Sequence, residues 1–336
     1  MIDIIIPTYK NKEGLIETLQ SIDWSNKQLH VTVVDDYSNI DYSLIQEQFP
    51  QIENWIYLPQ NVGPGRARQR GIDFTTHPYL MFIDTGDYFI SKEIQSEIIN
   101  TIKNDKISKM FMWHFTEDEK SHSNSVNNHL HGKVYKREFL QSYNITFSTS
   151  SSYANEDIGF NRACRMILKQ LERNQSCIYL RDMKKVAIMW PRTDPNSLTL
   201  KDDGAFPYQK QNWGLAYNMI HTYNILKPIK IDNDIIVEDV SDIMVQMYYT
   251  IICTIMLRPQ YIKDAWRGAK IFYDIVYKNV KVPDDYIQMH SSQMLRKVYQ
   301  RFSSTDLPFT LNMKRFLVEL DKNETPPTRY LTFNKN

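Results

Sequence analysis

The sequence predicts an α/β fold in which a mostly parallel sheet is flanked by helices, followed by a mainly helical C-terminal region. Three observations lead to this prediction. Short apolar segments alternate with segments of helical period over the first part of the chain, as in strand–helix–strand units. Polar residues directly follow three of the apolar segments. From about residue 205 onward the pattern is mainly helical.

The chain begins with a segment typical of a buried parallel strand. Residues 2–6 (IDIII) form a nearly continuous apolar run that ends at Pro7, and strands buried on both faces have such runs instead of alternating patterns. The elements predicted next are a helix over 10–22, a strand over 30–34, a weaker strand over 52–59, a helix over 64–76 opened by Pro64, a strand over 79–84 and a helix after the N-cap residue Ser91.

The pattern changes after about residue 108, and the chain divides near residue 204. The predicted elements are a strand over 109–115, a polar loop over 117–128, a segment over 129–140 that leads into a helix, a helix over 153–171, strands over 177–180 and 186–190, and helices over 213–226, 239–257 and 265–277. We therefore predict one domain over residues 1–204 and a helical region over residues 205–336.

Composition and charge narrow the class of protein. The chain is 42% hydrophobic and 24% charged, as expected of a globular protein, and its net charge of +1 gives no general basic field for nucleic acid. No stretch approaches about 18 to 20 consecutive apolar residues, so we expect no integral membrane segment. The N-terminus has no charged leader or cleavage site. The cysteines at 164, 177 and 253 are scattered and odd in number, which favours a reducing, cytoplasmic location.

Three predicted strands deliver polar residues to one edge of the sheet. Ligands of open α/β sheets bind beyond the carboxyl ends of the strands, and residues 7–9, 35–36 and 84–87 all follow predicted strands. Taken alone, FIDTGD (residues 82–87) is equally well explained as a surface turn, because Asp and Gly are common turn formers. Its coincidence with the two other polar strand ends favours a binding site.

An ordered set of motifs resembles one enzyme family. The segments are IIIPTYKNKEGLIETLQSI, VVDDYSN, QNVGPGRARQRGI, FIDTGD, HGKVYKREFL and NEDIGFN. In this order they resemble the inverting glycosyltransferases of family 2, which have the GT-A fold with its Rossmann-like sheet. The resemblance covers about residues 1–200. In the third segment the family pattern N-x-G-x-x-x-A-R-N-x-G is met except at Gln69, which replaces the second Asn.

The resemblance implies a nucleotide-sugar site, most simply for a UDP-sugar. Asp36, with Asp35 beside it, would hydrogen-bond the uracil or ribose. Arg68 would pair with a phosphate or with an acidic loop, since its guanidinium fork suits either; the alternative is a salt bridge on a helix surface. The full set of implied donor-binding residues is Pro7, Thr8, Tyr9, Asp35, Asp36, Asn61, Gly63, Arg68, Asp84, Thr85, His131, Lys133 and Ser197.

FIDTGD would be the metal motif of this family. A divalent cation held by carboxylates neutralises the charge that develops on a diphosphate leaving group, and Mn²⁺ or Mg²⁺ is the implied cofactor. The usual D-x-D-D pattern has Gly86 in place of its middle aspartate, which leaves open whether Asp87 contacts the metal directly. His131, preferred over His129, would complete a metal set of Asp84, Asp87 and His131.

NEDIGFN would supply the catalytic base. An inverting displacement needs a carboxylate on the side opposite the leaving group to take the acceptor proton. By resemblance Asp157 is this base, and Glu156 orients the acceptor or Asp157. Both residues stand near the N-terminus of a predicted helix, where the dipole favours ionised carboxylates, so the alternative explanation is simple capping charge.

The sequence therefore favours a metal-dependent, inverting glycosyltransferase that acts on an acceptor hydroxyl. Cell-surface polysaccharide, teichoic acid or lipopolysaccharide is the expected acceptor. The alternative acceptor is a hydroxylated base of phage DNA, which would have to be flipped out to reach Asp157. The other classes considered are a nucleotidyltransferase and a non-catalytic nucleotide-sugar-binding protein, for which Gly86 is the only hint. For the helical region over residues 205–336 we expect acceptor binding or association into a homo-oligomer.

Overall fold

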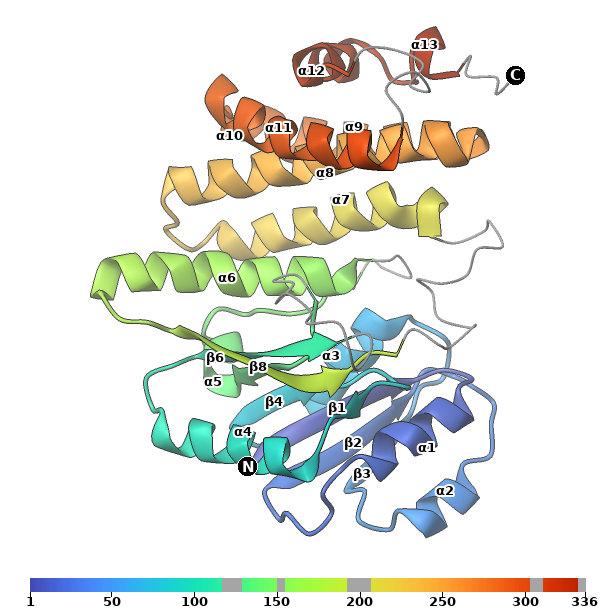
Figure 1. Ribbon diagram of the computed structural model, residues 1–336, viewed down its shortest axis with the longest axis vertical. Coiled ribbons are helices and arrows are strands. Elements are labelled where there is room, and N and C mark those ends of the chain that lie inside the picture. The colour runs from blue at the N-terminus through green and yellow to red at the C-terminus, as the bar shows by residue number, and fades with distance from the viewer. Residues whose placement is uncertain (117–128, 150–154, 192–206, 303–310, 332–336) are drawn as a thin grey trace. The chain divides into compact units, whose positions relative to one another are not determined.

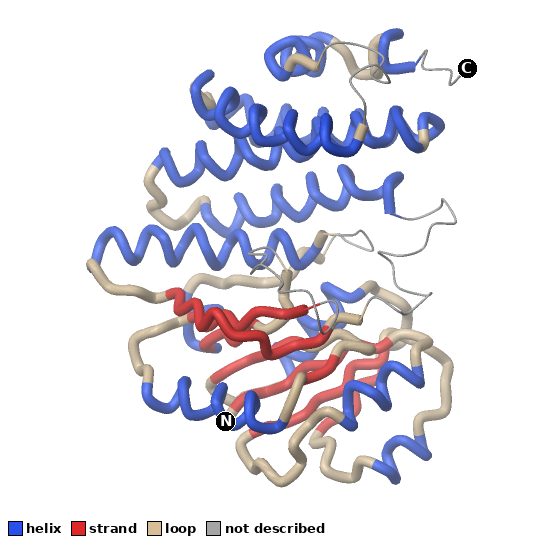
Figure 2. Tube along the Cα trace, in the orientation of Figure 1, coloured by secondary structure: helices blue, strands red, loops and turns tan. Residues whose placement is uncertain are grey.

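The computed structural model describes residues 1–116, 129–149, 155–191, 207–302 and 311–331. It forms two compact units, one made of Met1–Ser152 and Glu156–Leu200 and the other of Tyr153–Asn155 and Lys201–Asn336. Ser197 and the predicted polar loop over 117–128 lie outside the described residues. Figure 1 shows the helices and strands. In Figure 2 the strands, drawn red, mark the first unit, which contains the sheet.

The first unit is built on an eight-stranded mixed sheet with the order β3-β2-β1-β4-β7-β6-β8-β5. Strands β1 to β4 are mutually parallel, β7 runs antiparallel between β4 and β6, and β5 pairs antiparallel with β8. The strands are β1 (Ile2–Thr8), β2 (Leu29–Asp35), β3 (Asn54–Tyr57), β4 (Tyr79–Phe82), β5 (Tyr88–Phe89), β6 (Met110–Thr116), β7 (Lys133–Lys136) and β8 (Leu180–Met189).

Helices cover both faces of this sheet (Figure 1). Every residue of β1 is buried. Ile4 and Ile6 share a core with α1 and α4, while α3 packs against β1 and β2. This two-sided burial explains the unbroken apolar run at the start of the sequence. The helices of the unit are α1 (Lys12–Gln20), α2 (Ser43–Gln48), α3 (Pro64–Phe74), α4 (Lys92–Asn104), α5 (Arg137–Ser142) and α6 (Glu156–Gln175).

The sheet departs from the sequence prediction at its antiparallel strands. Residues 133–136 form β7 before the expected helix, and residues 88–89 form the short β5. The two strands expected over 177–180 and 186–190 are one strand, β8, whose pairing with β6 shifts register between Met112 and Phe115. These short or irregular strands are specified by their long-range partners, so the local pattern did not reveal them.

The second unit is helical, as predicted. Its long central helix α8 packs against α7, α9, α11 and α12, and Trp266, Phe316 and Tyr330 are fully buried within it. The elements are α7 (Pro207–Leu226), α8 (Asn233–Leu257), η1 (Pro259–Tyr261), α9 (Ile262–Phe272), η2 (Tyr273–Tyr277), α10 (Lys278–Val280), α11 (Asp284–Arg301), α12 (Met313–Lys322) and α13 (Thr328–Leu331).

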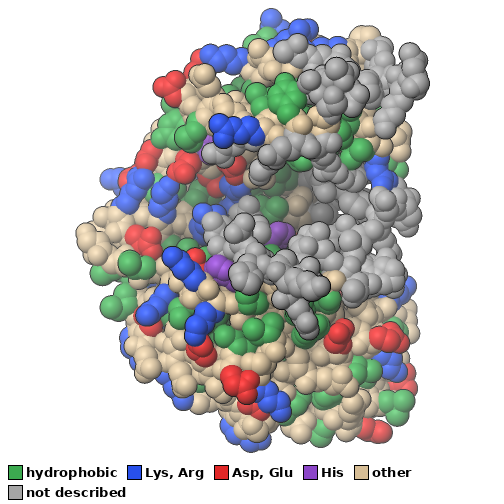
Figure 3. Space-filling view, viewed as in Figure 1, with side chains coloured by type: hydrophobic (Ala, Val, Ile, Leu, Met, Phe, Trp, Pro, Cys, Tyr) green, Lys and Arg blue, Asp and Glu red, His purple; other side chains and the backbone are tan. Residues whose placement is uncertain are grey.

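By length and composition, α8 is the one helix among the described residues that could cross a membrane, with a mean hydropathy of 1.5 over its most apolar stretch. The sequence predicts no such segment, because no stretch approaches about 18 to 20 consecutive apolar residues. In the structure 72% of that stretch is buried, which is the pattern of a core helix. Charges of both signs are intermixed on the face seen in Figure 3, in keeping with the net charge of +1.

Candidate active site

The carboxyl ends of β1, β2 and β4 meet at one edge of the sheet, because the three strands are parallel neighbours. Thr8 ends β1, Asp35 ends β2, and the 84–87 turn follows β4. The segment before β7 brings His131, which contacts Asp87 of this turn, and the start of α6 brings Glu156, which is joined to the turn through Arg68. Residues from five separate parts of the first unit thus form the candidate active site.

Arg68 joins two of these parts through a buried double ion pair. Its two terminal nitrogens lie 2.5 Å from Asp84 Oδ1 and 2.7 Å from Glu156 Oε1. Only 4% of the Arg68 side chain is exposed, so this is not a salt bridge on a helix surface. Burial disfavours the cation, but the two carboxylates outweigh burial and raise the pKa of Arg68 above its usual value. Of the partners expected for Arg68, the structure shows the acidic ones.

Close packing of α3 against the start of α6 brings Arg68 and Glu156 together. Gly65 lies one turn before Arg68 on α3, and a Cβ atom at Gly65 would lie 2.9 Å from Glu156 Cγ. A larger residue at this position would push the Glu156 side chain away. The absence of a side chain at Gly65 therefore permits the ion pair.

FIDTGD does form a turn, and the turn is anchored on both sides. The Asp87 N–H donates to the Asp84 carbonyl at 2.9 Å, and Gly86 has φ of +97°, a conformation that favours glycine. The Gly86 N–H donates to Thr18 Oγ1 at 2.9 Å, and the Thr85 hydroxyl donates to the Pro7 carbonyl at 2.7 Å. Thr85 and Pro7, both predicted to bind the donor, here fix the turn to β1.

The same turn brings together the three predicted metal ligands. One ligand atom from each of Asp84, Asp87 and His131 lies within 4.8 Å of the other two. His131 Nδ1 is 2.8 Å from Asp87 Oδ2, yet that buried oxygen receives no well-aligned hydrogen bond from the described residues. Two carboxylates and one imidazole suit a divalent cation. The side chains present therefore fit the implied metal.

The charges in this group depend on burial and on the neighbouring residues. Burial raises the pKa of Asp87 to about 6, although His131 opposes this shift. Burial is the largest single effect on His131 and favours its neutral imidazole, but the combined attraction of Asp87, Asp84 and Asp157 outweighs it and raises the pKa of His131. The Asp84 side chain is 39% exposed. Its partial burial opposes ionisation, but Arg68 holds the pKa of its carboxyl below the usual value.

The two carboxylates that begin α6 have different surroundings. Burial raises the pKa of Glu156, against the opposing effect of Arg68. Asp157 is more accessible, with 21% of its side chain exposed and Oδ2 placed 3.3 Å from His129 Nδ1. Burial opposes ionisation of Asp157, but His129 and Arg68 lower its pKa below the usual value. Asp157 is thus the ionised, accessible member of the pair, while Glu156 is held by Arg68.

Asp36 and Asp35 make contacts within the protein. The two oxygens of Asp36 accept hydrogen bonds from the N–H groups of Val62 and Gly63 at 2.7 and 2.8 Å, and Asn61 donates to the Asp36 carbonyl at 3.1 Å. Asp35 accepts hydrogen bonds from Ser38 and Tyr42. In the structure Asp36 therefore shapes the loop that enters α3, and Asp35 shapes the segment that follows β2. Direct contact of either residue with uracil or ribose stays a prediction.

The remaining predicted residues lie at different depths. Thr8 is buried, and Tyr9 is 46% exposed. Lys133 is buried and donates from Nζ to the His129 carbonyl. Burial lowers the pKa of Lys133 to about 7, against the opposing effect of Asp157.

Two aromatic residues near the metal group were not predicted as site residues. The Trp190 ring stacks on His131, with centroids 4.8 Å apart and 22° between the planes, and Phe115 lies 5.0 Å from the same ring. Both follow or end strands of the sheet. Their place at strand ends could have indicated a role in the site, but the prediction rested on polar residues at strand ends alone.

Comparison with known proteins matches the family described as Glycosyl transferase family 2 over residues 3–158. Similar curated proteins include three glycosyltransferases. The first is the processive diacylglycerol beta-glycosyltransferase of Mycoplasma genitalium (28% identical over 109 residues, 31% of this chain). The other two are the putative teichuronic acid biosynthesis glycosyltransferase TuaG of Bacillus subtilis (24% identical over 102 residues, 29% of this chain) and the amylovoran biosynthesis glycosyltransferase AmsB of Erwinia amylovora (29% identical over 101 residues, 28% of this chain). The matches span 32%, 40% and 34% of these relatives' own lengths.

Solved structures share the fold over most of the chain. Residues 1–349 of Staphylococcus aureus TarS in complex with UDP align with a TM-score of 0.58 at 16% identity, covering 89% of this chain and 90% of TarS 1–349. The mannosyltransferase PcManGT of Pyrobaculum calidifontis, in complex with GDP-Man and Mn²⁺, aligns with a TM-score of 0.51 at 13% identity, covering 96% of this chain and 86% of its own. At these identities the likeness concerns the fold.

Proposed function

Residues 3–158 of this chain are a family 2 glycosyl transferase domain, and from this premise we propose that the protein transfers a sugar from a nucleotide-sugar to an acceptor hydroxyl with inversion at the anomeric carbon. One observation carries the proposal. The acidic 84–87 turn and the acidic start of α6, from elements far apart in sequence, are joined by Arg68 into a single site at the carboxyl edge of the sheet.

The proposed reaction assigns different tasks to the two acidic groups. Asp157 accepts the proton of the acceptor hydroxyl as that oxygen bonds to the anomeric carbon, and the bond from that carbon to the diphosphate oxygen breaks. Glu156, tied to Arg68, holds the start of α6 in place. Asp84, Asp87 and His131 would hold a divalent cation, which when bound offsets the charge that develops on the leaving diphosphate.

The proposed donor is a UDP-sugar. TarS is known with UDP and with UDP-GlcNAc, whereas PcManGT is known with GDP-Man and Mn²⁺. Because the shared fold accommodates either nucleotide, the donor has to be established by direct comparison. The proposed acceptor is a cell-surface polymer or glycolipid, since the related sequences include enzymes named for teichuronic acid, amylovoran and diacylglycerol.

A thermal-shift comparison of UDP, GDP, CDP and dTDP, each with Mn²⁺, Mg²⁺ or EDTA, tests the donor and the metal together. Ligands that bind the native state raise the melting temperature. We expect UDP to do so only with metal, and Mn²⁺-dependent hydrolysis of a UDP-sugar to follow. Stabilisation by a different nucleotide would correct the donor, and stabilisation in EDTA would remove the metal from the proposal. No shift with any nucleotide would contradict the proposed function.

A further inference from the structure

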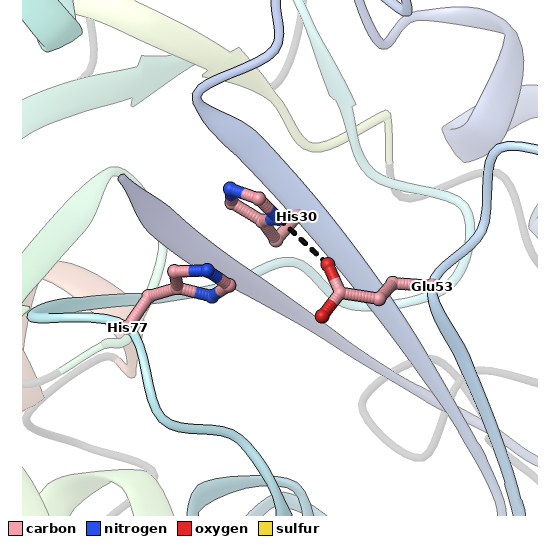
Figure 4. A group of neighbouring side chains, drawn as sticks. All are labelled: His30, Glu53 and His77. Carbon is pink, nitrogen blue, oxygen red and sulfur yellow. Dashed lines mark hydrogen bonds and ion pairs between the residues drawn. The ribbon is translucent and has the colours of Figure 1, made fainter.

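A second group of metal-ligating side chains lies at the opposite, amino edge of the same sheet. His30 is near the start of β2, Glu53 immediately precedes β3, and His77 lies in the connection between α3 and β4. One ligand atom from each lies within 4.8 Å of the other two. Figure 4 shows the two imidazoles facing one another with the Glu53 carboxylate beside them. β1 spans the sheet between the two edges, a distance of roughly 20 Å for a seven-residue strand.

His77 is held as metal-bound histidines usually are. Its Nδ1 lies 2.7 Å from Asp3 Oδ1, and the His77 backbone N–H donates to Asp3 Oδ2 at 2.8 Å. Arg137 fixes Asp3 from the other side with a 2.7 Å contact. A carboxylate on one ring nitrogen orients the imidazole and makes the other nitrogen a better ligand. His77 Nε2 is the nitrogen left for a metal.

His30 also has one ring nitrogen beside a carboxylate and the other without a partner among the described residues. Its Nδ1 lies 2.6 Å from Glu53 Oε2, while its buried Nε2 has no hydrogen-bond partner among the described residues. The Glu53 side chain is 46% exposed, so an ion can reach the group and keep water ligands. A buried ring nitrogen without a partner is costly, and a metal ion would satisfy it.

The His30 ring must rotate for His30 and His77 to bind one ion, because Asp3 holds the His77 ring in place. The two ring centroids are 3.6 Å apart with 20° between the planes, so their in-plane lone pairs run nearly parallel instead of converging. The terminal torsion of histidine has a broad, shallow energy profile. Rotation of His30 would break its contact with Glu53, after which the imidazole and the carboxylate could bind the same ion.

We propose that His30, Glu53 and His77 form a binding site for Zn²⁺ or a similar borderline divalent metal, separate from the candidate active site. Two imidazoles and one carboxylate are a donor set that suits Zn²⁺, which tolerates a water as the fourth ligand. The hard cation expected at Asp84 and Asp87 prefers oxygen ligands. The two edges of the sheet thus differ in the metals that they select.

The test is a calorimetric titration of the full-length protein with Zn²⁺ in excess Mg²⁺. The variants are Glu53→Gln and His77→Gln. Glu47→Gln, at another exposed carboxylate of the first unit, is the matched control, and Asp87→Asn reports on the carboxyl edge. We expect one Zn²⁺-binding event in the wild type, the control and Asp87→Asn. It should be about tenfold or more weaker in Glu53→Gln and His77→Gln.

Each other outcome would overturn the site. Equal Zn²⁺ isotherms for Glu53→Gln and the control would remove Glu53 and the proposed cluster with it. Loss of the event in Asp87→Asn but not in Glu53→Gln would place the Zn²⁺ at the candidate active site. If His77→Gln does not fold, Glu53→Gln still decides the question, because its exposed side chain can change without a large effect on packing.

Discussion

At the scale of single residues, the buried cation Arg68 determines how the candidate active site is assembled. It faces two carboxylates that belong to different elements, and the contact with Glu156 spans 88 residues of sequence. Without Arg68, the buried Glu156 and the partly exposed Asp84 would lose the cation that they share. Removal of one partner from a buried ion pair is therefore expected to be expensive.

We predict that Arg68→Ala lowers the free energy of unfolding by about 3 to 5 kcal/mol, because it leaves buried charge without compensation. Urea denaturation measures the loss. Arg66→Ala, on the exposed side of the same helix, should change stability by less than about 0.5 kcal/mol. Equal effects of the two substitutions would mean that the double ion pair contributes little.

We predict that Asp157→Asn slows sugar transfer by about a hundredfold to ten-thousandfold, the range typical of a general base. Nucleotide binding should stay within a few-fold of the wild type, because Asp157 acts on the acceptor. Transfer assays and thermal shifts with UDP separate the two effects, with Asp73→Asn, an exposed change on α3, as the control. Lost nucleotide binding in Asp157→Asn would contradict its assignment as the base.

At the scale of elements, the junction of α3 and α6 depends on the missing side chain at Gly65. In an exposed helix, Gly→Ala stabilises by about 0.5 to 1 kcal/mol. Here the added Cβ would lie 2.9 Å from Glu156 Cγ, so we predict that Gly65→Ala destabilises the protein by about 1 to 3 kcal/mol and weakens nucleotide binding. Urea denaturation measures the sign of the stability change. A gain in stability would show that the two helices can move apart freely and that their junction does not depend on Gly65.

The turn between α4 and β6 offers a pH test. Burial opposes ionisation of Asp105, but hydrogen bonds from Ser108, Arg181 and Ile107 lower its pKa to about 2. A carboxyl with a pKa depressed in the folded state contributes stability above its unfolded pKa, and this stability is lost as the pH falls through the folded value. We therefore predict that wild type exceeds Asp105→Ala in stability by about 1 kcal/mol above pH 4. The difference should shrink between pH 4 and 2, and a constant difference would contradict the assigned cause.

The sequence predicted the elements whose own segment shows a clear apolar pattern. β1, β2 and β4 are apolar runs because helices or strands cover them on all sides, and α1 and α4 carry both a helical period and a capping side chain. β7 was missed because KVYK is short and its antiparallel place between β4 and β6 depends on chain segments elsewhere. Local patterns cannot encode that pairing.

The same limit applies to the candidate site. Asp84, Asp87 and His131 were predicted together, and the structure brings them together. The sequence did not predict that Arg68 joins Asp84 to Glu156. It left the partner of Arg68 open, because a guanidinium suits carboxylates and phosphates equally. Trp190 went unnoticed because nothing in its own segment distinguishes a ring that stacks on a site histidine from one in the core.

At the scale of the whole molecule, the question is whether α8 belongs to a protein core or to a membrane. We predict that the protein folds without detergent and that Ile251→Asp, at a fully buried position, destabilises it by several kcal/mol, about 3 or more. Leu257→Asp, where 41% of the side chain is exposed, should be tolerated. Circular dichroism on heating compares the two. Equal tolerance of both substitutions would contradict a core position for α8.

The anchored turn at residues 84–87 has a consequence for the thermodynamics of substrate binding. Its residues are fixed by Thr18, by the Pro7 carbonyl and by Arg68 before any nucleotide arrives. The conformational entropy of ordering these carboxylates is thus lost during folding, and a donor that binds later has little of it left to lose. Folding of the first unit and preorganisation of its acidic site are one event, so a substitution that loosens the turn should weaken binding mainly through entropy.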